Sequence, residues 1–480
     1  MSGSLNSTSY VGSGTGNSGS DSGTTIIAGG YQYVGYSGGV GTATGTVIQG
    51  GYQFLGYGSG GTGYASSTTI SAGAQYVGES GGTGYATSTT ILNGGSQNVG
   101  FDSGSGFASN TTIASGGIQY VGIGSGASGT AITTTIEALA TQIVGYVGNG
   151  SATDTTLSGG QQYLGYGSGT GTGIATNTII NNGGQQYVGY GSSATGVATN
   201  TTISGRGSQY VGDGGTGYAT STTIDSGGSQ FVNSGGTAID TTIYSGGLAD
   251  VLSGGVINAP VIDGGTLQLA AGATIGSGGI DFAAVSGLNG GTLDLSGMGT
   301  GAAFTSDFTA VISGFTGTGG SQSASDEINV VGAGSGDYLN WSQGAGSGVL
   351  DVLNGGTVLE SMTLAGTYST NQFVLSNAGS VDEIFYNTSN ACYCAGTRIS
   401  TERGEIAVEN LNIGDRLLTE SGAPRPLKWI GTRSYSARFA GNNPDLLPIR
   451  FKAGSLDENV PARDLLVSPK HAMFLDGVLI

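Results

Sequence analysis

The sequence is poor in charge, cysteine, proline and histidine. The shortages of cysteine and proline each exclude a class of protein. Its 480 residues hold 2 Cys, 7 Pro and 1 His, and only 9% are charged, against about 25% in an average soluble domain. Two cysteines cannot build a disulfide framework, and scarce proline without glycine at every third position excludes collagen. No apolar run reaches the roughly 18 residues of a membrane-spanning helix, so we expect no transmembrane segment.

Glycine is the abundant residue, with 99 copies, and it disfavours helix throughout the chain. Ile, Val and Tyr return at regular positions, which argues against disorder. In the first 391 residues only Arg206 stands against twenty acidic residues, whereas the other eleven Lys and Arg follow Cys392. Without a basic patch we expect no nucleic-acid binding. This composition suits a secreted or cell-surface protein, although residues 1–6 lack a classical signal peptide and leave the export route open.

A repeat of about 22 residues fills the first half of the chain. Most copies read Thr-Thr-Ile, a Gly-Gly turn, Gln-Tyr-Val and a Gly-rich corner, as between Thr111 and Val121. Two short strands per copy bury little alone, but copies stacked about 4.8 Å apart pair their backbones and align their Ile and Val side chains. We therefore predict an all-β fold, a right-handed β-solenoid of about a dozen coils that is nearly free of helix.

Strand alternation places each Gln on the same side as the inward Val, so we predict a buried ladder of Gln amides. The residue between them faces outward and is usually aromatic. This predicted aromatic row consists of Tyr33, Phe54, Tyr76, Tyr120, Tyr163, Tyr187, Tyr210 and Phe231. One interpretation is that the rings only stack on one another. The other is that they form a strip that binds host or surface glycans or proteins.

The repeats between residues 9 and 252 resemble the stalk repeats of bacterial autotransporter adhesins of the diffuse-adherence type. The resemblance rests on the pattern Thr-Thr-Ile-x-x-Gly-Gly-x-Gln-x-Val. It implies a surface-exposed passenger involved in adhesion. Those adhesins continue into a membrane β-barrel translocator, which we do not expect to follow these repeats, so their export route is not carried over.

Beyond residue 252 the period decays, while Gly-Gly turns and short strands continue. We predict a solenoid at 1–252, an irregular continuation at 253–303, a β-rich module at 304–390 that caps the exposed strand edges, and a last domain at 391–480. Asp326, Glu327 and Asp337 of the capping module could hold calcium, but we interpret them as solvated acids and expect no metal and no cofactor.

Three short motifs follow one another in the last domain. They are Cys392-x-x-x-Gly396-Thr397, the segment from Val408 to Gly414-Asp415, and Ser468-Pro-Lys-His471. In this order they resemble the Hint domain, the fold shared by inteins and hedgehog autoprocessing segments. Since the chain ends nine residues after His471, before the closing strands, we interpret residues 391–480 as the N-terminal part of a truncated Hint domain.

The resemblance implies that Cys392 is a nucleophile, that the Ala391–Cys392 bond is scissile, and that His471 is the general acid. It also implies that Ser468 forms a hydrogen bond near the scissile amide. The side chains suit this chemistry. A thiolate can convert the preceding amide into a thioester, and an imidazole with an ordinary pKa near 6.5 can protonate the departing nitrogen.

The remaining motif residues have weaker chemical interpretations. Gly396, Thr397 and Asp415 support the motif, and we expect Asp415 to end a turn. Cys394 is a rival nucleophile, but its spacing to Gly-Thr is wrong. Asp464 either orients the imidazole of His471 or is a surface carboxylate.

The sequence therefore predicts an exported or surface adhesin-like passenger with a Hint domain that cleaves its own chain. Water, a thiol or an amine would resolve the thioester. Any activity would be intramolecular autoprocessing and not the turnover of an external substrate. The alternative is a purely structural surface or adhesion protein with an inactive Hint remnant.

Overall fold

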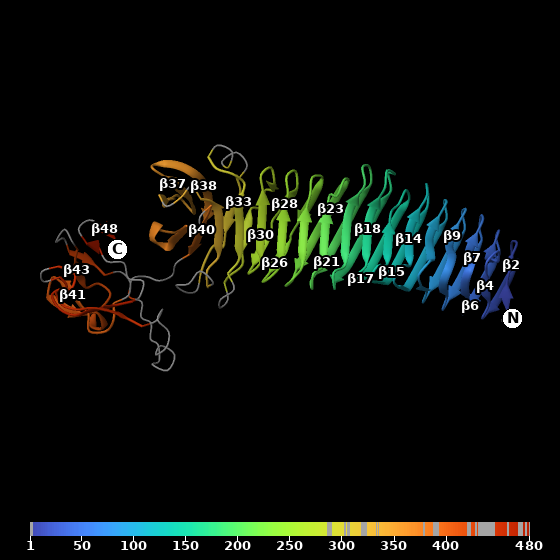
Figure 1. The fold of residues 1–480 in the computed structure, drawn as a ribbon, viewed down its shortest axis with the longest axis horizontal. Coiled ribbons are helices and arrows are strands. Elements are labelled where there is room, and N and C mark those ends of the chain that lie inside the picture. Colours follow the sequence, from blue (N-terminus) through green and yellow to red (C-terminus); the bar gives the residue numbers. More distant parts are fainter. Residues whose placement is uncertain are drawn as a thin grey trace. The chain divides into compact units, whose positions relative to one another are not determined.

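The computed structural model of the chain is built from β-strands (Figure 1). It describes residues 3–285, 290–301, 304, 308–317, 324–332, 334, 336–377, 380–386, 393–419, 424–427, 430, 447–457, 460–468, 474–475 and 478–479. The helical elements with bounds in these ranges are two short 3-10 turns, η2 (Thr370–Gln372) and η3 (Val408–Asn410). The predicted all-β fold is confirmed. The chain divides into two compact units, residues 1–318 with 322–386, and residues 319–321 with 387–480.

The first unit is a β-solenoid whose coils stack into three columns of parallel strands (Figure 1). The Gln column holds β2 (Thr8–Ser13), β5 (Tyr31–Tyr36), β7 (Val47–Tyr57), β9 (Thr69–Glu79), β12 (Gly95–Phe101), β14 (Ile118–Ile123), β16 (Thr141–Val144), β18 (Gln161–Tyr166), β20 (Gln185–Tyr190), β22 (Ser208–Val211), β24 (Ser229–Val232), β27 (Leu248–Val251), β30 (Thr266–Ala270), β33 (Thr292–Gly297) and β35 (Glu327–Val331). The Ala column holds β3 (Ser18–Ser22), β6 (Val40–Thr44), β8 (Thr62–Ser66), β10 (Thr83–Thr87), β13 (Ser105–Ile113), β15 (Ser128–Glu137), β17 (Asn149–Ser158), β19 (Thr172–Asn181), β21 (Thr195–Ile203), β23 (Thr216–Ile224), β25 (Gly236–Ile239), β28 (Val256–Asn258) and β31 (Thr274–Ile275). The Ile column holds the Thr-Thr-Ile parts of the longer strands together with β1 (Ser4–Leu5), β4 (Thr25–Ile27), β11 (Thr90–Ile91), β26 (Thr242–Tyr244), β29 (Val261–Asp263), β32 (Ile280–Phe282) and β34 (Val311–Ser313).

The Ala column is a third strand per coil, where two were predicted. Its strands carry Gly and Ala at the inward positions, as Gly84 and Ala86 do in β10, and the sequence pattern was interpreted as a corner. Small inward residues bury little surface, so they leave no strong apolar period to detect. The predicted solenoid of about a dozen stacked coils is otherwise confirmed, and equivalent residues stand opposite each other, with Gln97 paired to both Gln75 and Gln119.

The core of the solenoid consists of aligned inward residues, one set per column. In one coil these are Ala108, Ile113 and Val121, which are 2%, 0% and 0% exposed. Burying one such Val or Ile contributes about 1.5–3 kcal/mol relative to leaving it exposed. Because the same positions repeat in every coil, each coil is held mainly by its two neighbours.

The corners between columns need unusual backbone conformations. Gly78 adopts φ +74°, and a Cβ at this position would lie 1.9 Å from the Ser105 carbonyl oxygen, so only glycine fits. The corner before Thr-Thr-Ile is also left-handed, with φ 53° at Asn110 and 57° at Ser67. Asn and Asp tolerate this conformation better than most residues, and Ser, Asn or Asp precede several of the Thr-Thr-Ile triplets.

The Gln ladder predicted from the sequence runs through the interior as a directional chain of amides. From Gln53 to Gln230 each Nε2 donates to the Gln Oε1 of the preceding coil at 2.6–2.8 Å. At one end the Gln32 amide donates to the Asp21 carboxylate at 2.6 Å, and at the other the Thr241 hydroxyl donates to Gln230 Oε1 at 3.1 Å. Both ends of the ladder are therefore satisfied.

Breaking the ladder should cost stability, and adjacent glutamines provide a matched test. Gln162→Met removes the acceptor of Gln186 and the donor to Gln142, and each orphaned buried group costs about 1–3 kcal/mol. Gln161 is the outward neighbour of Gln162, and Gln161→Met leaves the ladder intact. Urea unfolding followed by circular dichroism should show the larger loss in Gln162→Met, and equal losses would contradict the ladder.

The first unit ends in antiparallel strands that cover the last coils. β36 (Asp337–Gln343), β37 (Ser347–Asn354) and β38 (Thr357–Ala365) form one meander, and β39 (Phe373–Asn377) and β40 (Val381–Tyr386) form a hairpin. β38 pairs with β34 of the Ile column and β40 with β35 of the Gln column, so we call β36–β40 the cap. These pairings give hydrogen-bond partners to backbone groups at the strand edges that the solenoid would otherwise leave open.

The interpretation of Asp326 as a solvated acid is wrong. Asp326 is 1% exposed and accepts backbone hydrogen bonds from Gly291 at 3.0 Å and Thr316 at 2.8 Å. Burial raises its pKa to about 6, although both hydrogen bonds act in the opposite direction. Its carboxylate ties the coil around β33 to the segment that leads into β35.

The second unit contains short antiparallel strands. β41 (Arg398–Thr401), β42 (Gly404–Ala407), β43 (Arg416–Leu418) and β44 (Pro424–Pro426) form one sheet. β45 (Ile449–Phe451) pairs with β46 (Leu465–Val467), and β47 (Phe474–Leu475) pairs with β48 (Val478–Leu479). All three predicted motifs belong to this unit.

Candidate functional site

The first and third motifs meet in the second unit. Tyr393 forms an antiparallel bridge with Val467, and the backbone N–H of Cys394 donates to the Leu466 carbonyl at 3.3 Å. Tyr393 directly follows Cys392, and Val467 directly precedes Ser468. Two segments more than 70 residues apart in the sequence are thus joined next to the predicted nucleophile and the predicted hydrogen-bonding serine. Ala391, Cys392 and His471 lie outside the described residues.

The turn after the predicted nucleophile is held by the second motif. The Thr397 N–H donates to the Cys394 carbonyl at 3.1 Å, and the Val408 N–H donates to the Thr397 carbonyl at 2.8 Å. The Glu409 carboxylate accepts from the Gly396 N–H at 2.8 Å, and this bond is the main cause that lowers the pKa of Glu409. Glu409 was not singled out from the sequence, because nothing in its neighbourhood indicates a contact 13 residues away.

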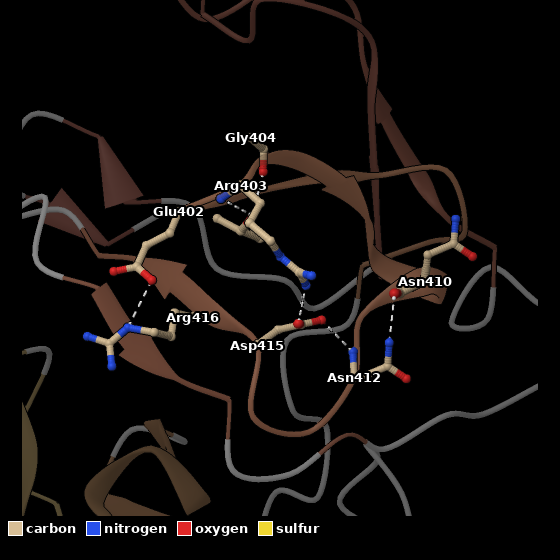
Figure 2. A network of polar contacts seen from close by, with 8 residues as sticks. Glu402, Arg403, Gly404, Asn410, Asn412, Asp415 and Arg416 are labelled. Atoms are coloured by element: carbon tan, nitrogen blue, oxygen red, sulfur yellow. Dashed lines mark hydrogen bonds and ion pairs between the residues drawn. The ribbon is translucent and has the colours of Figure 1, made fainter.

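Asp415 fixes the turn at the end of the second motif (Figure 2). Its carboxylate accepts a hydrogen bond from the Asn412 N–H at 2.8 Å and forms an ion pair with the Arg403 guanidinium. Beside it, Arg416 forms an ion pair with Glu402 at 3.0 Å (Figure 2). The carboxylate of Asp415 is therefore engaged in holding the loop together, which suits a structural role.

Asp464 is engaged by its own neighbourhood. One oxygen accepts from the Arg450 guanidinium, with Nε at 2.8 Å, and the other accepts from the Ala453 N–H at 2.9 Å. The bond from Ala453 is the main cause that lowers the pKa of Asp464, and Arg450 adds to it. Of the two interpretations of Asp464, this geometry favours the surface carboxylate.

The predicted aromatic row of the solenoid is stacked face to face in two runs, from Tyr33 to Tyr76 and from Tyr163 to Phe231, and Asn98 and Ile143 interrupt it on either side of Tyr120. Tyr163 and Tyr187 have ring centroids 4.7 Å apart with an interplanar angle of 6°, and Tyr187 and Tyr210 repeat this at 4.9 Å and 11°. A second row, missed in the sequence, stands beside it, with Tyr166 and Tyr190 stacked on each other and edge-on to the first row. Neighbouring rings cover most ring faces in such a column, so edges and hydroxyl groups meet the solvent.

Glu79 occupies a position of the second row, between Tyr57 of one coil and Phe101 of the next. One carboxylate oxygen is buried and accepts no hydrogen bond. Burial raises the pKa of Glu79 to about 7 from an ordinary 4.5, and Asp102 adds to this shift by repulsion. The folded protein therefore holds this proton more tightly than the unfolded chain does.

Glu79 therefore makes a contribution to the free energy of unfolding that depends on pH. Glu79 adds stability below pH 4.5, and the contribution is lost as pH rises through about 7. Glu79→Gln should remove this part of the pH dependence and stabilise the protein at pH 8, as measured by urea unfolding across that range. The exposed Glu137→Gln variant is the control. Identical pH profiles for wild type and Glu79→Gln would contradict the prediction.

Among the described residues, no helix is long and apolar enough to cross a membrane. Within the same ranges, no three His, Cys, Asp or Glu side chains gather as a set of metal ligands.

Comparison with known proteins identifies both parts of the chain. Residues 391–480 match the Hint domain family, and residues 215–266 match the family described as adhesin of bacterial autotransporter system, probable stalk. Among solved structures, the chain is similar to a TibC-catalysed, hyper-glycosylated fragment of TibA, with 40% identity over 58% of this chain and 87% of that one, at a TM-score of 0.45. No curated protein matches significantly. The chain is an autotransporter-adhesin-type repeat protein that carries a Hint domain.

Proposed function

We propose that this adhesin-like passenger is released or attached through cleavage of its own chain at the Ala391–Cys392 bond by the Hint domain. The observation that carries the proposal is the Tyr393–Val467 bridge, because it joins the chain neighbours of Cys392 and Ser468. Proximity of this kind lets a side chain from the third motif act on the peptide bond before Cys392. The Hint family match over residues 391–480 supports the same assignment.

The reaction uses only groups of the chain until its last step. The Cys392 thiolate attacks the carbonyl carbon of Ala391, the C–N bond breaks, and His471 gives a proton to the departing nitrogen. The product is a thioester between Ala391 and the Cys392 sulfur, with a free amino group on Cys392. Water, a thiol or an amine then attacks the thioester and restores the Cys392 thiol, leaving the passenger with a new end at Ala391.

The described residues contribute by holding the reacting segment in place. Glu409 and Thr397 fix the turn that follows Cys392 through hydrogen bonds of 2.8 Å. Ser468 lies beside Val467 and belongs to the segment bridged to Tyr393, which suits the role of hydrogen bonding near the scissile amide. Cys394 is a half-buried thiol in that turn and has no assigned step.

The repeats favour a second, structural component of the function at the cell surface or after secretion. Stacked rings such as Tyr163 and Tyr187 cover one another's faces, which favours a stiff stalk over a row of open sugar-stacking platforms. Recognition of glycans or proteins would then use ring edges and hydroxyl groups. A purely structural surface protein with an inactive Hint remnant remains the alternative that the cleavage experiment decides.

The experiment incubates the purified protein with dithiothreitol and weighs the products by mass spectrometry. The expected result is a passenger fragment that ends at Ala391, carrying either a free carboxylate or the thiol adduct. A chain that stays whole under these conditions would leave the structural alternative. Cleavage at any other bond would contradict the assignment of Cys392.

A further inference from the structure

The outer face of the Ala column carries an exposed aromatic stack that no part of the proposed function uses. Tyr64 of β8 and Tyr85 of β10 stand opposite each other in register. Their ring centroids are 5.0 Å apart, with an interplanar angle of 9°. The two side chains are 42% and 37% exposed. Among the stacked Tyr pairs of the described coils, this is the one in which both rings are exposed.

Tyrosine is the side chain of the solenoid that an oxidant attacks most readily. Residues 2–297 contain 18 of the 23 Tyr but no Cys, Met, Trp or His. Cys and Met are the usual first targets of oxidation in proteins, so an oxidant that reaches this face meets no competing sulfur. Oxidation of a phenol also releases its proton, which an exposed ring gives directly to water. Burial opposes this release in the Gln column, where it raises the pKa of Tyr163 to about 12.

We propose that Tyr64 and Tyr85 are a site of oxidative modification, at which hydrogen peroxide and a haem peroxidase couple the two rings into a dityrosine cross-link. Each phenol loses one electron and its phenolic proton, and the two phenoxyl radicals form one carbon–carbon bond between ring positions next to the oxygens. The hydrogens on those two carbons move to the oxygens, which restores both phenols. The two electrons and two protons reduce one peroxide molecule to two molecules of water.

The parallel register favours coupling within one chain. Paired residues of neighbouring coils lie about 4.8 Å apart along the stack, so both rings are tethered side by side and meet by rotation of their side chains. On its other side Tyr64 stands opposite Thr42, and Tyr85 stands opposite Phe107. Neither ring therefore has a second Tyr in register beside it. The cross-link joins one defined pair of coils.

A bond of this kind reinforces a stalk that is otherwise held by noncovalent contacts. Each coil contacts only its two neighbours, so tension along the solenoid can separate it between two coils. A carbon–carbon bond between β8 and β10 prevents that separation at this point. Unlike a disulfide, it also survives reduction by thiols. This role depends on the repeats alone and not on cleavage by the Hint domain.

The test treats the purified protein, at low concentration, with a haem peroxidase and hydrogen peroxide. The product is unfolded, digested with thermolysin and analysed by mass spectrometry. We expect a linked pair of peptides that contains Tyr64 and Tyr85 and is lighter by two hydrogen atoms than the separate peptides. Denaturing electrophoresis should show this product at the position of the single chain, because the bond forms within one molecule.

Conservative variants assign the bond to this pair. Tyr64→Phe keeps the ring and removes one phenol, so it should abolish the linked peptides, and Tyr85→Phe should do the same. Tyr218 is the matched control, because it is 43% exposed at the equivalent position of β23 but stands between Val197 and Thr237. Tyr218→Phe should leave the yield of the Tyr64–Tyr85 link unchanged.

A double variant tests the need for neighbouring coils. Thr42→Tyr combined with Tyr64→Thr keeps the number of Tyr on this face but separates them by an intervening coil, and it should give no link to Tyr85. A link of wild-type yield in this variant would overturn the proposal. Absence of the linked pair from oxidised wild type would also overturn it, as would a link between Tyr64 and Tyr85 found only in covalent dimers.

Discussion

Replacing Val121 by Asp is expected to open the solenoid at its middle. Val121 is 0% exposed and stands between Val99 and Val144 of the neighbouring coils, so the new carboxylate has no route to water and no cationic partner. Leaving an uncompensated charge in the interior costs about 3–5 kcal/mol. A stack of coils cannot bypass one defective member, because each coil contacts only its two neighbours.

Val40→Asp is the matched control, since Val40 faces outward from β6 and is 43% exposed. It is a cleaner control than Tyr120, the outward neighbour of Val121, because Tyr120 is half-buried and burial raises its pKa. Urea unfolding should show a large loss for Val121→Asp and a small change for Val40→Asp. Limited proteolysis should cut Val121→Asp first near β14. Equal effects of the two variants would contradict the inward position of Val121.

The parts of the fold that repeat were the parts that the sequence could predict. Ile113, Gln119 and Val121 recur in nearly every copy, so their inward positions follow from the period and strand alternation alone. The ends of the Gln ladder did not follow. Asp21 closes one end as a single residue outside the Gln positions, and the repeated Thr position supplies Thr241 at the other end, where Ala249 replaces the next Gln. The second aromatic row was missed because the motif was followed only as far as the corner glycine.

The non-repeating regions depend on contacts that no pattern in the sequence predicts. Asp326, next to Glu327 in the sequence, was interpreted as a solvated acid, whereas its buried carboxylate accepts backbone hydrogen bonds from residues 291 and 316 in other segments. In the second unit the order of the three motifs predicted the Hint domain correctly. The bond from Gly396 to Glu409 could not be predicted, because it depends on how the turn folds back on the second motif.

The chemistry proposed for the Hint domain separates two kinds of residue by the size of their effects. A nucleophile that forms the covalent intermediate cannot be replaced by solvent at the same position, so its loss ends the reaction. A general acid assists one proton transfer and typically contributes 10²–10⁴ in rate. Residues that only hold the reacting segment in place, such as Glu409, act through its geometry. Replacing them should slow cleavage by anything from an undetectable amount up to these limits.

Cys392→Ala is therefore expected to abolish cleavage at the Ala391–Cys392 bond, and His471→Ala is expected to slow it by about 10²–10⁴. The departing amide nitrogen needs a proton, and His471 is the only His of the chain. Cys394→Ala keeps the nucleophile and should cleave at close to the wild-type rate, which controls for loss of a thiol in the same turn. Time courses of the dithiothreitol reaction, followed by mass spectrometry of the purified variants, give all three rates. Cleavage that continues in Cys392→Ala, or that stops in Cys394→Ala alone, would contradict the assignment of Cys392 as the nucleophile. That assignment rests on the geometry of the acyl shift, because only the thiol that directly follows the scissile bond can form its five-membered transition state.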